Sequence, residues 1–259
     1  MKTVVLGAGN VAYSLCHVLL QHQIEIVQIY SRTLLSAHAL RDFVGQEIPC
    51  VNDLKEIVSD ADLYIYALKD DCLQSVIPQI VTNEQAWHIH TSGGVGLEVF
   101  EGKKNYGILY PFQTFSKAKP LTDWREIPLF VVTNVEKVDD SHFLLRLARL
   151  LSSQVLVVQP EELDKLHIAG VFANNFTNYM YCCAKQVLAS TSIPFSVLIP
   201  LIQQTAQKIQ TLSPQEAQTG PAKRNDKTVI EKELNILQST DQTLADIYRL
   251  LSEGIVRNG

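Results

Sequence analysis

The sequence lacks several features that mark membrane and nucleic-acid proteins. No run approaches about 18 uncharged apolar residues, so we expect no membrane-spanning helix. Basic residues are also scarce, since 22 lysines and arginines face 27 acidic residues and the net charge is −5. Such a balance gives no support to binding of nucleic acid or of an acidic membrane surface. We therefore expect a small-molecule substrate as the partner, with no nucleic acid and no membrane.

Cysteine is sparse, and its pattern is uninformative for metals. The five cysteines are odd in number and lack the paired spacing of a metal site. Cys182 and Cys183 are adjacent, which suits neither a zinc site nor an easy disulfide. The N-terminus enters a strand pattern at once, without the layout of a signal peptide. We expect no metal, free thiols and a cytoplasmic location, because thiols persist in a reducing compartment.

The first 158 residues alternate short apolar runs with longer amphipathic ones. The apolar runs predict strands at residues 2–6, 25–30, 63–68, 86–90, 107–110, 128–132 and 155–158, with a short one near 48–51. Helical patterns occupy residues 11–21, 34–44 and 141–151, and a capping-box pattern at residues 53–56 predicts another helix. This alternation predicts an α/β fold: a doubly wound, mainly parallel Rossmann sheet with helices on both faces.

The pattern changes at Gln159-Pro160, because a proline followed by acids is a typical helix start. Residues 163–189 then form one long helical pattern whose apolar residues surround much of the circumference, so we expect this helix to be buried. More helices are predicted at 194–212, 229–237 and 240–256, with a polar loop at 213–227. We predict a dinucleotide-binding Rossmann domain at 1–159 and an all-helical substrate and dimerisation domain at 160–259.

The first strand ends in a glycine-rich turn, Gly7-Ala8-Gly9-Asn10-Val11-Ala12. Gly7 allows a tight turn, Gly9 lets the backbone approach a pyrophosphate, and the small Ala12 allows close helix packing. The helix that starts near Asn10 and Val11 points free N–H groups at the phosphates. A tight turn without a ligand is the alternative, but a strand before and a helix after the motif favour a dinucleotide.

The end of the second strand bears on the choice of cofactor. NAD-binding folds commonly place Asp or Glu there to bind the ribose 2′-hydroxyl. This chain has Ser31, Arg32 and Thr33 instead, all of which can donate hydrogen bonds to a 2′-phosphate. We therefore expect the cofactor to be NADP(H), although Arg32 as a solvated side chain is the alternative.

Other strand ends should lie near the same ligand, because ligands bind beyond the carboxyl ends of parallel strands. The predicted cofactor contacts there are Leu68, Lys69, Ser92 and Gly93. Lys69 could equally be a solvated loop residue. His90 could donate a proton, but a histidine whose hydrogen bonds are satisfied at a strand end is the favoured alternative. The run from Tyr110 to Phe115 contains Gln113, which could line a substrate pocket or pack between domains.

The long helix offers the candidate catalytic residues His167 and Asn174, and Asn178 as a substrate residue. Spacings of seven and four residues place the three side chains on one helix face. Histidine titrates near neutral pH and suits the role of proton donor in hydride transfer to C=O or C=N. The alternative is a buried hydrogen-bond network between helices.

Together these residues resemble the NADP-dependent oxidoreductase group that includes pyrroline-5-carboxylate reductase and deazaflavin-dependent NADP reductase. The sequence is also similar, over nearly its whole length, to a bacterial subfamily of Rossmann-like proteins named as NADP oxidoreductases. That resemblance is carried by residues 110–115, 167–175 and 219–226. Two features depart from the expected patterns. Tyr110 stands where the subfamily leads us to expect histidine. Lys165 is followed four residues later by Ala169, so the Lys-x-x-x-Asn pair of β-hydroxyacid dehydrogenases is missing.

The resemblance implies a homodimer formed by the C-terminal helices. Arg224 and Asp226, in the polar loop, are candidate substrate residues, since an arginine can bind a carboxylate bidentately. A solvated loop charge is the alternative for Arg224. The leading hypothesis is an NADP-dependent oxidoreductase that acts on a small carbonyl or imine. The other hypothesis is a catalytically silent NADP(H)-binding sensor, which the missing lysine and the tyrosine at position 110 would fit.

Overall fold

The computed structural model describes residues 1–135 and 138–258. Residues 1–175 form one compact unit and residues 176–259 form another. The first is a sheet covered by helices and the second is made of helices, so the predicted fold class is confirmed. In the described part of the chain, every helix is too short or too polar to cross a bilayer.

The first unit contains one sheet with the strand order β3-β2-β1-β4-β5-β6-β7-β8. Its strands are β1 (Lys2–Leu6), β2 (Glu25–Tyr30), β3 (Cys50–Val51), β4 (Leu63–Tyr66), β5 (Trp87–His90), β6 (Asn105–Pro111), β7 (Leu129–Thr133) and β8 (Val155–Val157). All neighbours are parallel except β6 and β7, which are antiparallel. The chain order reverses between β1 and β4, and such a reversal opens a crevice at the carboxyl ends of the strands.

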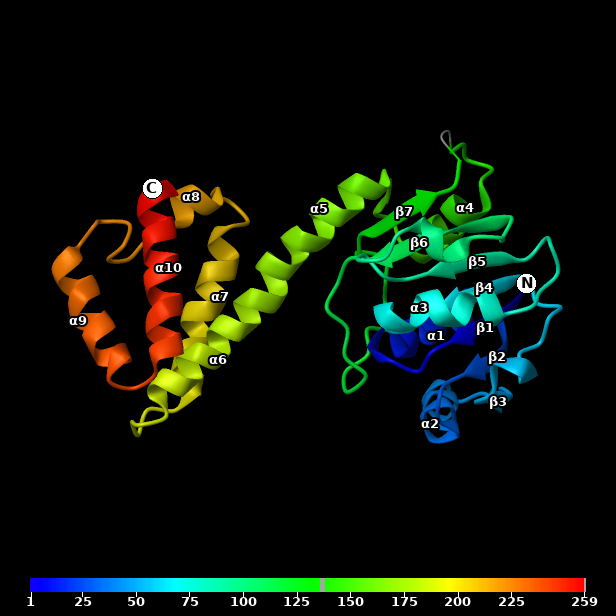
Figure 1. The fold of residues 1–259 in the computed structure, drawn as a ribbon, viewed down its shortest axis with the longest axis horizontal. Coiled ribbons are helices and arrows are strands. Elements are labelled where there is room, and N and C mark those ends of the chain that lie inside the picture. Colours follow the sequence, from blue (N-terminus) through cyan, green and yellow to red (C-terminus); the bar gives the residue numbers. More distant parts are fainter. Residues whose placement is uncertain (136–137, 259) are drawn as a thin grey trace. The chain divides into compact units, whose positions relative to one another are not determined.

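Helices cover both faces of this sheet because its strands are apolar on both sides. Along β1, Val5 belongs to a core under α1 (Asn10–Gln21), α2 (Leu34–Val44) and α4 (Phe143–Leu151). Val4 and Leu6 point the other way, into a core that includes Leu73 of α3 (Asp70–Val76). In Figure 1, α3 lies in front of the sheet and α4 behind it.

The predicted helix after the capping-box pattern at residues 53–56 is wrong, since only a three-residue 3-10 turn forms there, Leu54–Glu56. The side chain of Gln28 ends this turn: its amide donates to the Glu56 carbonyl at 2.9 Å, and its oxygen accepts from the Val58 N–H at 3.0 Å. Helix α3 was not predicted, because its seven residues are too few to establish a helical period.

Residues 112–128, which we call the crossing segment, lead from β6 to β7 and pass the start of α1. The Asn10 side-chain oxygen accepts from the Lys117 N–H at 3.2 Å. The hydroxyl of Ser14, which is fully buried, accepts from the Leu121 N–H at 2.9 Å. Two hydrogen bonds to the first turns of α1 therefore fix the middle of the crossing segment.

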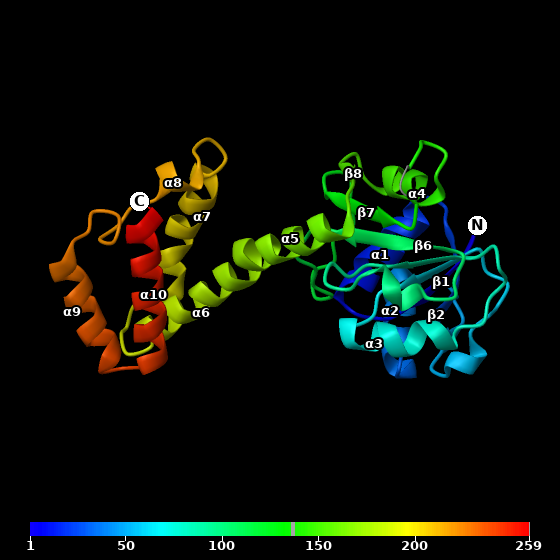
Figure 2. The ribbon, with the colours of Figure 1, turned by 45° about the horizontal axis from the view of Figure 1, so that its top comes forward.

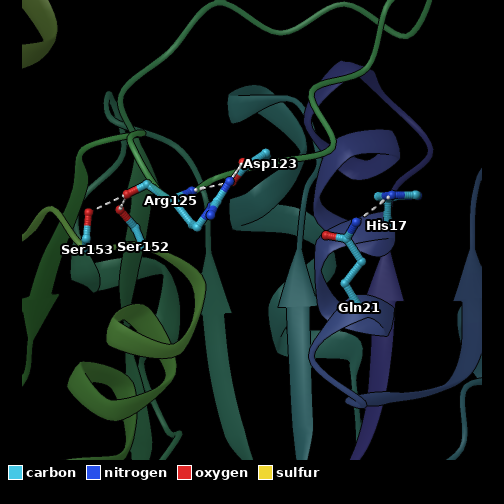
Figure 3. Close-up of polar contacts among 6 residues, drawn as sticks. All are labelled: His17, Gln21, Asp123, Arg125, Ser152 and Ser153. Atoms are coloured by element: carbon cyan, nitrogen blue, oxygen red, sulfur yellow. Dashed lines mark hydrogen bonds and ion pairs between the residues drawn. The ribbon is translucent and has the colours of Figure 1, made fainter.

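The far end of the crossing segment is fixed to the end of α4, as Figure 3 shows. The Arg125 carbonyl accepts hydrogen bonds from the hydroxyls of Ser152 at 3.2 Å and Ser153 at 2.6 Å. The Arg125 guanidinium pairs with Asp123, whose pKa the Arg125 hydrogen bonds lower to about 2. The same view shows His17 and Gln21 hydrogen-bonded to each other along α1 at 3.1 Å.

One long helical run follows β8: α5 (Pro160–Gly170), a π-helical segment (Val171–Phe176) and α6 (Thr177–Leu188). The prediction that this run is buried is wrong for the single chain. Ile168 is 57% exposed and Tyr179 is 50% exposed, because no described element of the chain covers them. Leu163 is the exception, packed against Ile108 and Val132 of the sheet. This contact joins α5 to the first unit, while a division of functional domains near Pro160 stays a prediction.

The second unit contains α7 (Ile199–Lys208), α8 (Pro214–Ala217), α9 (Lys227–Gln238) and α10 (Gln242–Asn258), all visible in Figure 2. The short helix α8 lies in the stretch predicted as a loop, where Ser213 and Glu216 cap each other. Helix α9 begins after Asp226, whose carboxylate accepts from the Val229 N–H at 3.3 Å, and so it starts two residues before the predicted residue 229. Burial raises the pKa of Tyr248, which bonds Glu233, to about 12.

Candidate cofactor cleft and active site

A cleft of about 470 Å³ opens where the strand order reverses. It lies at the carboxyl ends of β1, β2 and β4, and the crossing segment contributes to its wall. The lining residues are Gly7, Ala8, Gly9, Tyr30, Ser31, Arg32, Ser36, Ala67, Leu68, Lys69, Cys72, Ser75, Val76 and Lys117. Six of the predicted cofactor residues are among them: Gly7, Gly9, Ser31, Arg32, Leu68 and Lys69.

The glycine turn forms the floor of the cleft. Gly7 has a φ of +123°, and a Cβ there would stand 2.1 Å from the Ala67 carbonyl oxygen, so no other residue fits. Gly9 precedes α1 as its N-cap and provides no side-chain hydrogen bond to the first turn. The first N–H groups of this 12-residue helix, and its positive end, are therefore available to an anion.

The charged residues that line the cleft are all cationic. Arg32, Lys69 and Lys117 line it, and none of its lining residues carries a carboxylate. The hydroxyls of Ser31 and Ser36 add neutral hydrogen-bond donors. A cleft with this wall attracts a polyanion such as a phosphorylated dinucleotide.

Two of these residues, Lys117 and Ser36, were missed by the sequence reasoning. Lys117 reaches the cleft from the crossing segment, 107 positions after Asn10, whose side chain bonds its backbone. No local pattern in the sequence marks that contact. Ser36 lies in the first turn of α2, which begins at Leu34 directly after the Ser31-Arg32-Thr33 run.

The other predicted cofactor residues have different surroundings. Thr33 caps α2, since its hydroxyl donates to the Ser36 Oγ at 2.9 Å and accepts from the Ser36 N–H at 3.4 Å. Asn10 bonds the crossing segment, and Val11 and the fully buried Ala12 lie in the first turn of α1. Their predicted cofactor contacts stay predictions.

A second hollow of about 250 Å³ lies at the end of β6, beside α5. It brings together three residues predicted to act on the substrate, His167, Asn174 and Gln113. The other lining residues are Tyr110, Phe112, Thr114, Gly170, Val171, Ala173 and Asn175. Gly170 permits the close approach, because a Cβ there would meet the Phe112 ring at 2.7 Å.

Tyr110 and His167 face each other in this hollow, with the phenol oxygen 3.2 Å from Nδ1 of the ring. Gly93, which follows β5, makes room for the tyrosine: a Cβ there would stand 2.5 Å from the Tyr110 ring. On the other side of His167, Nε2 lies 3.6 Å from where a Cβ on Gly94 would stand, and a carboxylate oxygen of Asp70 lies 3.3 Å from the same point. Burial, and then the Asp70 charge, raise the pKa of Tyr110.

His90 has the structural role that the sequence reasoning favoured. Its Nδ1 accepts from the Ser92 N–H at 3.2 Å, so Nε2 carries the proton and donates to the Gly96 carbonyl at 3.3 Å. Burial lowers the pKa of His90 to about 4. The ring is therefore neutral near pH 7 and shapes the turn that carries Ser92 and Gly93.

Three candidate substrate residues, Asn178, Arg224 and Asp226, lie in the second unit. Asn178 is on α6, Arg224 is exposed in the turn after Gly220, and Asp226 caps α9. Their contacts with a substrate stay predictions. Within the described residues, no three His, Cys, Asp or Glu side chains gather as metal ligands.

Comparison with known proteins supports this view of the fold. Residues 129–255 match a family described as a domain of unknown function, DUF2520, and residues 1–77 match the shikimate/quinate 5-dehydrogenase family. No protein of curated function matches the sequence.

Solved structures similar to this chain come from several organisms. A Bacteroides fragilis protein assigned as an NADP oxidoreductase, BF3122, is 40% identical, with coverage of 99% of this chain and 98% of that one and a TM-score of 0.88. Protein TM1727 from Thermotoga maritima is 20% identical, with coverage of 99% and 97% and a TM-score of 0.71. A pyrroline-5-carboxylate reductase from Coxiella burnetii is 14% identical, with coverage of 98% and 97% and a TM-score of 0.57. The last two likenesses show the shared fold.

Proposed function

The chain belongs to the same family as the Bacteroides NADP oxidoreductase, and from this membership we propose that it is an NADP(H)-dependent oxidoreductase acting on a small carbonyl or imine. The cleft at the strand-order reversal carries the proposal, because it combines a glycine turn, a free helix start and three cations. Those are the groups that hold a pyrophosphate and a ribose 2′-phosphate.

Each part of the cleft has a distinct proposed role. Gly7, Gly9 and the start of α1 bind the pyrophosphate, and Arg32 with Ser31 binds the 2′-phosphate. When bound, the nicotinamide supplies or accepts the hydride. Thr33, Asn10, Val11, Ala12, Ser92 and Gly93 remain proposed cofactor contacts.

The hollow beside β6 is the proposed place of the substrate. His167 gives a proton to the oxygen or nitrogen that gains negative charge as hydride arrives. Gln113 and Asn174 orient the substrate by hydrogen bonds, since both line the same hollow as His167. Asn178, Arg224 and Asp226 are proposed as further substrate residues contributed by the helical unit.

Calorimetry and absorbance test this proposal directly. NADPH should bind the purified protein more tightly than NADH does. NADPH absorbance should then fall steadily with at least one member of a panel of small ketones and cyclic imines. Binding without turnover of any panel member, and with no effect of His167→Ala on a cellular phenotype, would favour the NADP(H) sensor instead. A lack of affinity for both nucleotides contradicts both hypotheses.

We also propose that two copies of the chain pair through their helical units. Many large apolar side chains of this unit are solvent-exposed in the single chain, including Leu201 at 65%, Leu250 at 65% and Ile209 at 56%. Among its described residues, by contrast, Leu244, Ala245 and Ala222 are the buried apolar ones. Large exposed apolar areas often mark protein–protein interaction sites, and a homodimer interface is more apolar than the rest of the surface.

A further inference from the structure

We infer that Tyr110 is a positioning residue that orients the His167 ring and keeps a proton on its Nε2, facing the space beside Gly94 and Asp70. This inference rests on the proposed function for its catalytic meaning, since that function makes His167 the proton donor. Its structural content stands on the geometry of Tyr110, His167, Gly93 and Asp70 alone.

The tyrosine is held rigidly enough to orient its neighbour. Its ring lies against the backbone of Gly93, where even a methyl group would stand 2.5 Å from the ring carbon that bears the hydroxyl. The ring also packs edge-on against Phe112, with 5.9 Å between ring centres, and against the cluster of Ile108, Val132 and Leu163. The hydroxyl therefore stays at the 3.2 Å hydrogen-bond distance from Nδ1 of His167.

The direction of this hydrogen bond follows from the charge on the other side of the imidazole. A carboxylate oxygen of Asp70 and Nε2 of His167 both lie within 4 Å of the point where a Cβ on Gly94 would stand. A lone pair on Nε2 would be repelled by that carboxylate, whereas an N–H there is attracted. The neutral ring thus carries its proton on Nε2, and the Tyr110 hydroxyl donates to Nδ1.

The hydroxyl can also serve the charged ring. A phenol is both donor and acceptor, so it can turn and accept from Nδ1–H once His167 is protonated. In both charge states Nε2 then carries a proton that faces the space beside Gly94. A phenylalanine would keep the ring packing against Gly93 but would lose this control.

NMR of the full chain with ¹⁵N-labelled histidine tests the inference without a substrate. At about pH 9 a histidine ring is neutral, and long-range ¹H–¹⁵N correlations distinguish its two tautomers. We expect His167, assigned with His167→Gln, to favour the Nε2–H form, because Asp70 attracts a proton on Nε2 and the phenol donates a stronger hydrogen bond to Nδ1 than it accepts from Nδ1–H. Tyr110→Phe should lower the ratio of Nε2–H to Nδ1–H, and the preference that remains is the part due to Asp70.

The matched control is Tyr106→Phe, which removes a hydroxyl from the same strand, next to Phe100 rather than His167. It should leave the tautomer of His167 unchanged. An Nδ1–H tautomer in the unmodified protein, or equal tautomer populations in the protein and Tyr110→Phe, overturns the inference. The affinity for NADPH, measured on the same samples, tests the proposed function separately from the tautomer of His167. If the unmodified protein does not bind NADPH, the proposed function is contradicted and the tautomer result still stands.

Discussion

At the scale of single residues, the site depends most on Gly7, a position where any side chain would overlap a neighbouring atom. Gly7 combines a positive φ with a carbonyl oxygen only 2.1 Å from the would-be Cβ. Gly102 has a comparable φ of +84°, but no atom lies within 4 Å of its would-be Cβ. Both glycines carry a positive φ, but of the two only Gly7 would also suffer steric overlap of a Cβ.

We predict that Gly7→Ala lowers the free energy of unfolding more than Gly102→Ala does. Gly102→Ala should cost about 1–2 kcal/mol from the left-handed backbone alone. Gly7→Ala should cost about 1–3 kcal/mol more, because Ala67 must move. Urea unfolding followed by tryptophan fluorescence measures both, since Trp87 and Trp124 both lie in the first unit. Equal losses would contradict the steric argument.

Arg32 is the residue that should distinguish the two nicotinamide nucleotides. We predict that Arg32→Ala raises the Kd for NADPH by about 10-fold or more, the loss expected for a charge-assisted hydrogen bond, and leaves the Kd for NADH nearly unchanged. Arg41→Ala is the control, because Arg41 lies on α2, pairs with Asp42 and does not line the cleft. Calorimetry with both nucleotides gives the comparison. A parallel loss for NADPH and NADH would remove Arg32 from the 2′-phosphate site.

At the scale of elements, the crossing segment gives the cleft a cation from far along the chain. Its backbone bonds to Asn10 and Ser14 hold Lys117 at the start of α1, next to the glycine turn. The crossing segment connects β6 with the antiparallel strand β7, and on the way it passes the start of α1.

We predict that Lys117→Ala weakens NADPH binding about 3- to 10-fold at low salt, and less at high salt because exposed charges are screened. Lys119→Ala removes the same charge two residues along the segment, outside the residues that line the cleft. That control should leave the affinity nearly unchanged. If both variants weaken binding alike, Lys117 acts only through the net charge of the protein.

At the scale of the whole molecule, the apolar surface of the helical unit predicts assembly. Leu201→Glu places a charge on this surface, at a side chain that is 65% exposed in the single chain. We predict that the unmodified protein sediments as a dimer at micromolar concentration and that Leu201→Glu shifts it toward the monomer, because burying an unpaired charge is costly. Val81→Glu, at a 78% exposed position of the first unit, should leave the dimer intact. A monomeric unmodified protein would contradict the proposal.

The sequence by itself determined the architecture of the first unit and the glycine turn. Strands β1 and β2 and helix α2 have the predicted bounds, because their periodicity and flanking residues are local. The turn at Gly7 was also predictable, since it requires a positive φ and glycine is the residue that adopts one readily. The prediction of NADP(H) as the cofactor came from Ser31 and Arg32, which share the cleft with Gly7 and Gly9.

Only the tertiary structure decided which distant residues meet. The Gln28 side chain ends the turn at residues 54–56, Lys117 joins the glycine turn, and Tyr110 meets His167 across 57 positions. The sequence predicted a buried helix, but Ile168 and Tyr179 are exposed in the single chain. An apolar helix face has the same sequence pattern whether its own chain or a second copy covers it. Local pattern sets the elements because it acts over a few residues. Contacts between side chains far apart in the chain depend on how the whole fold brings them together.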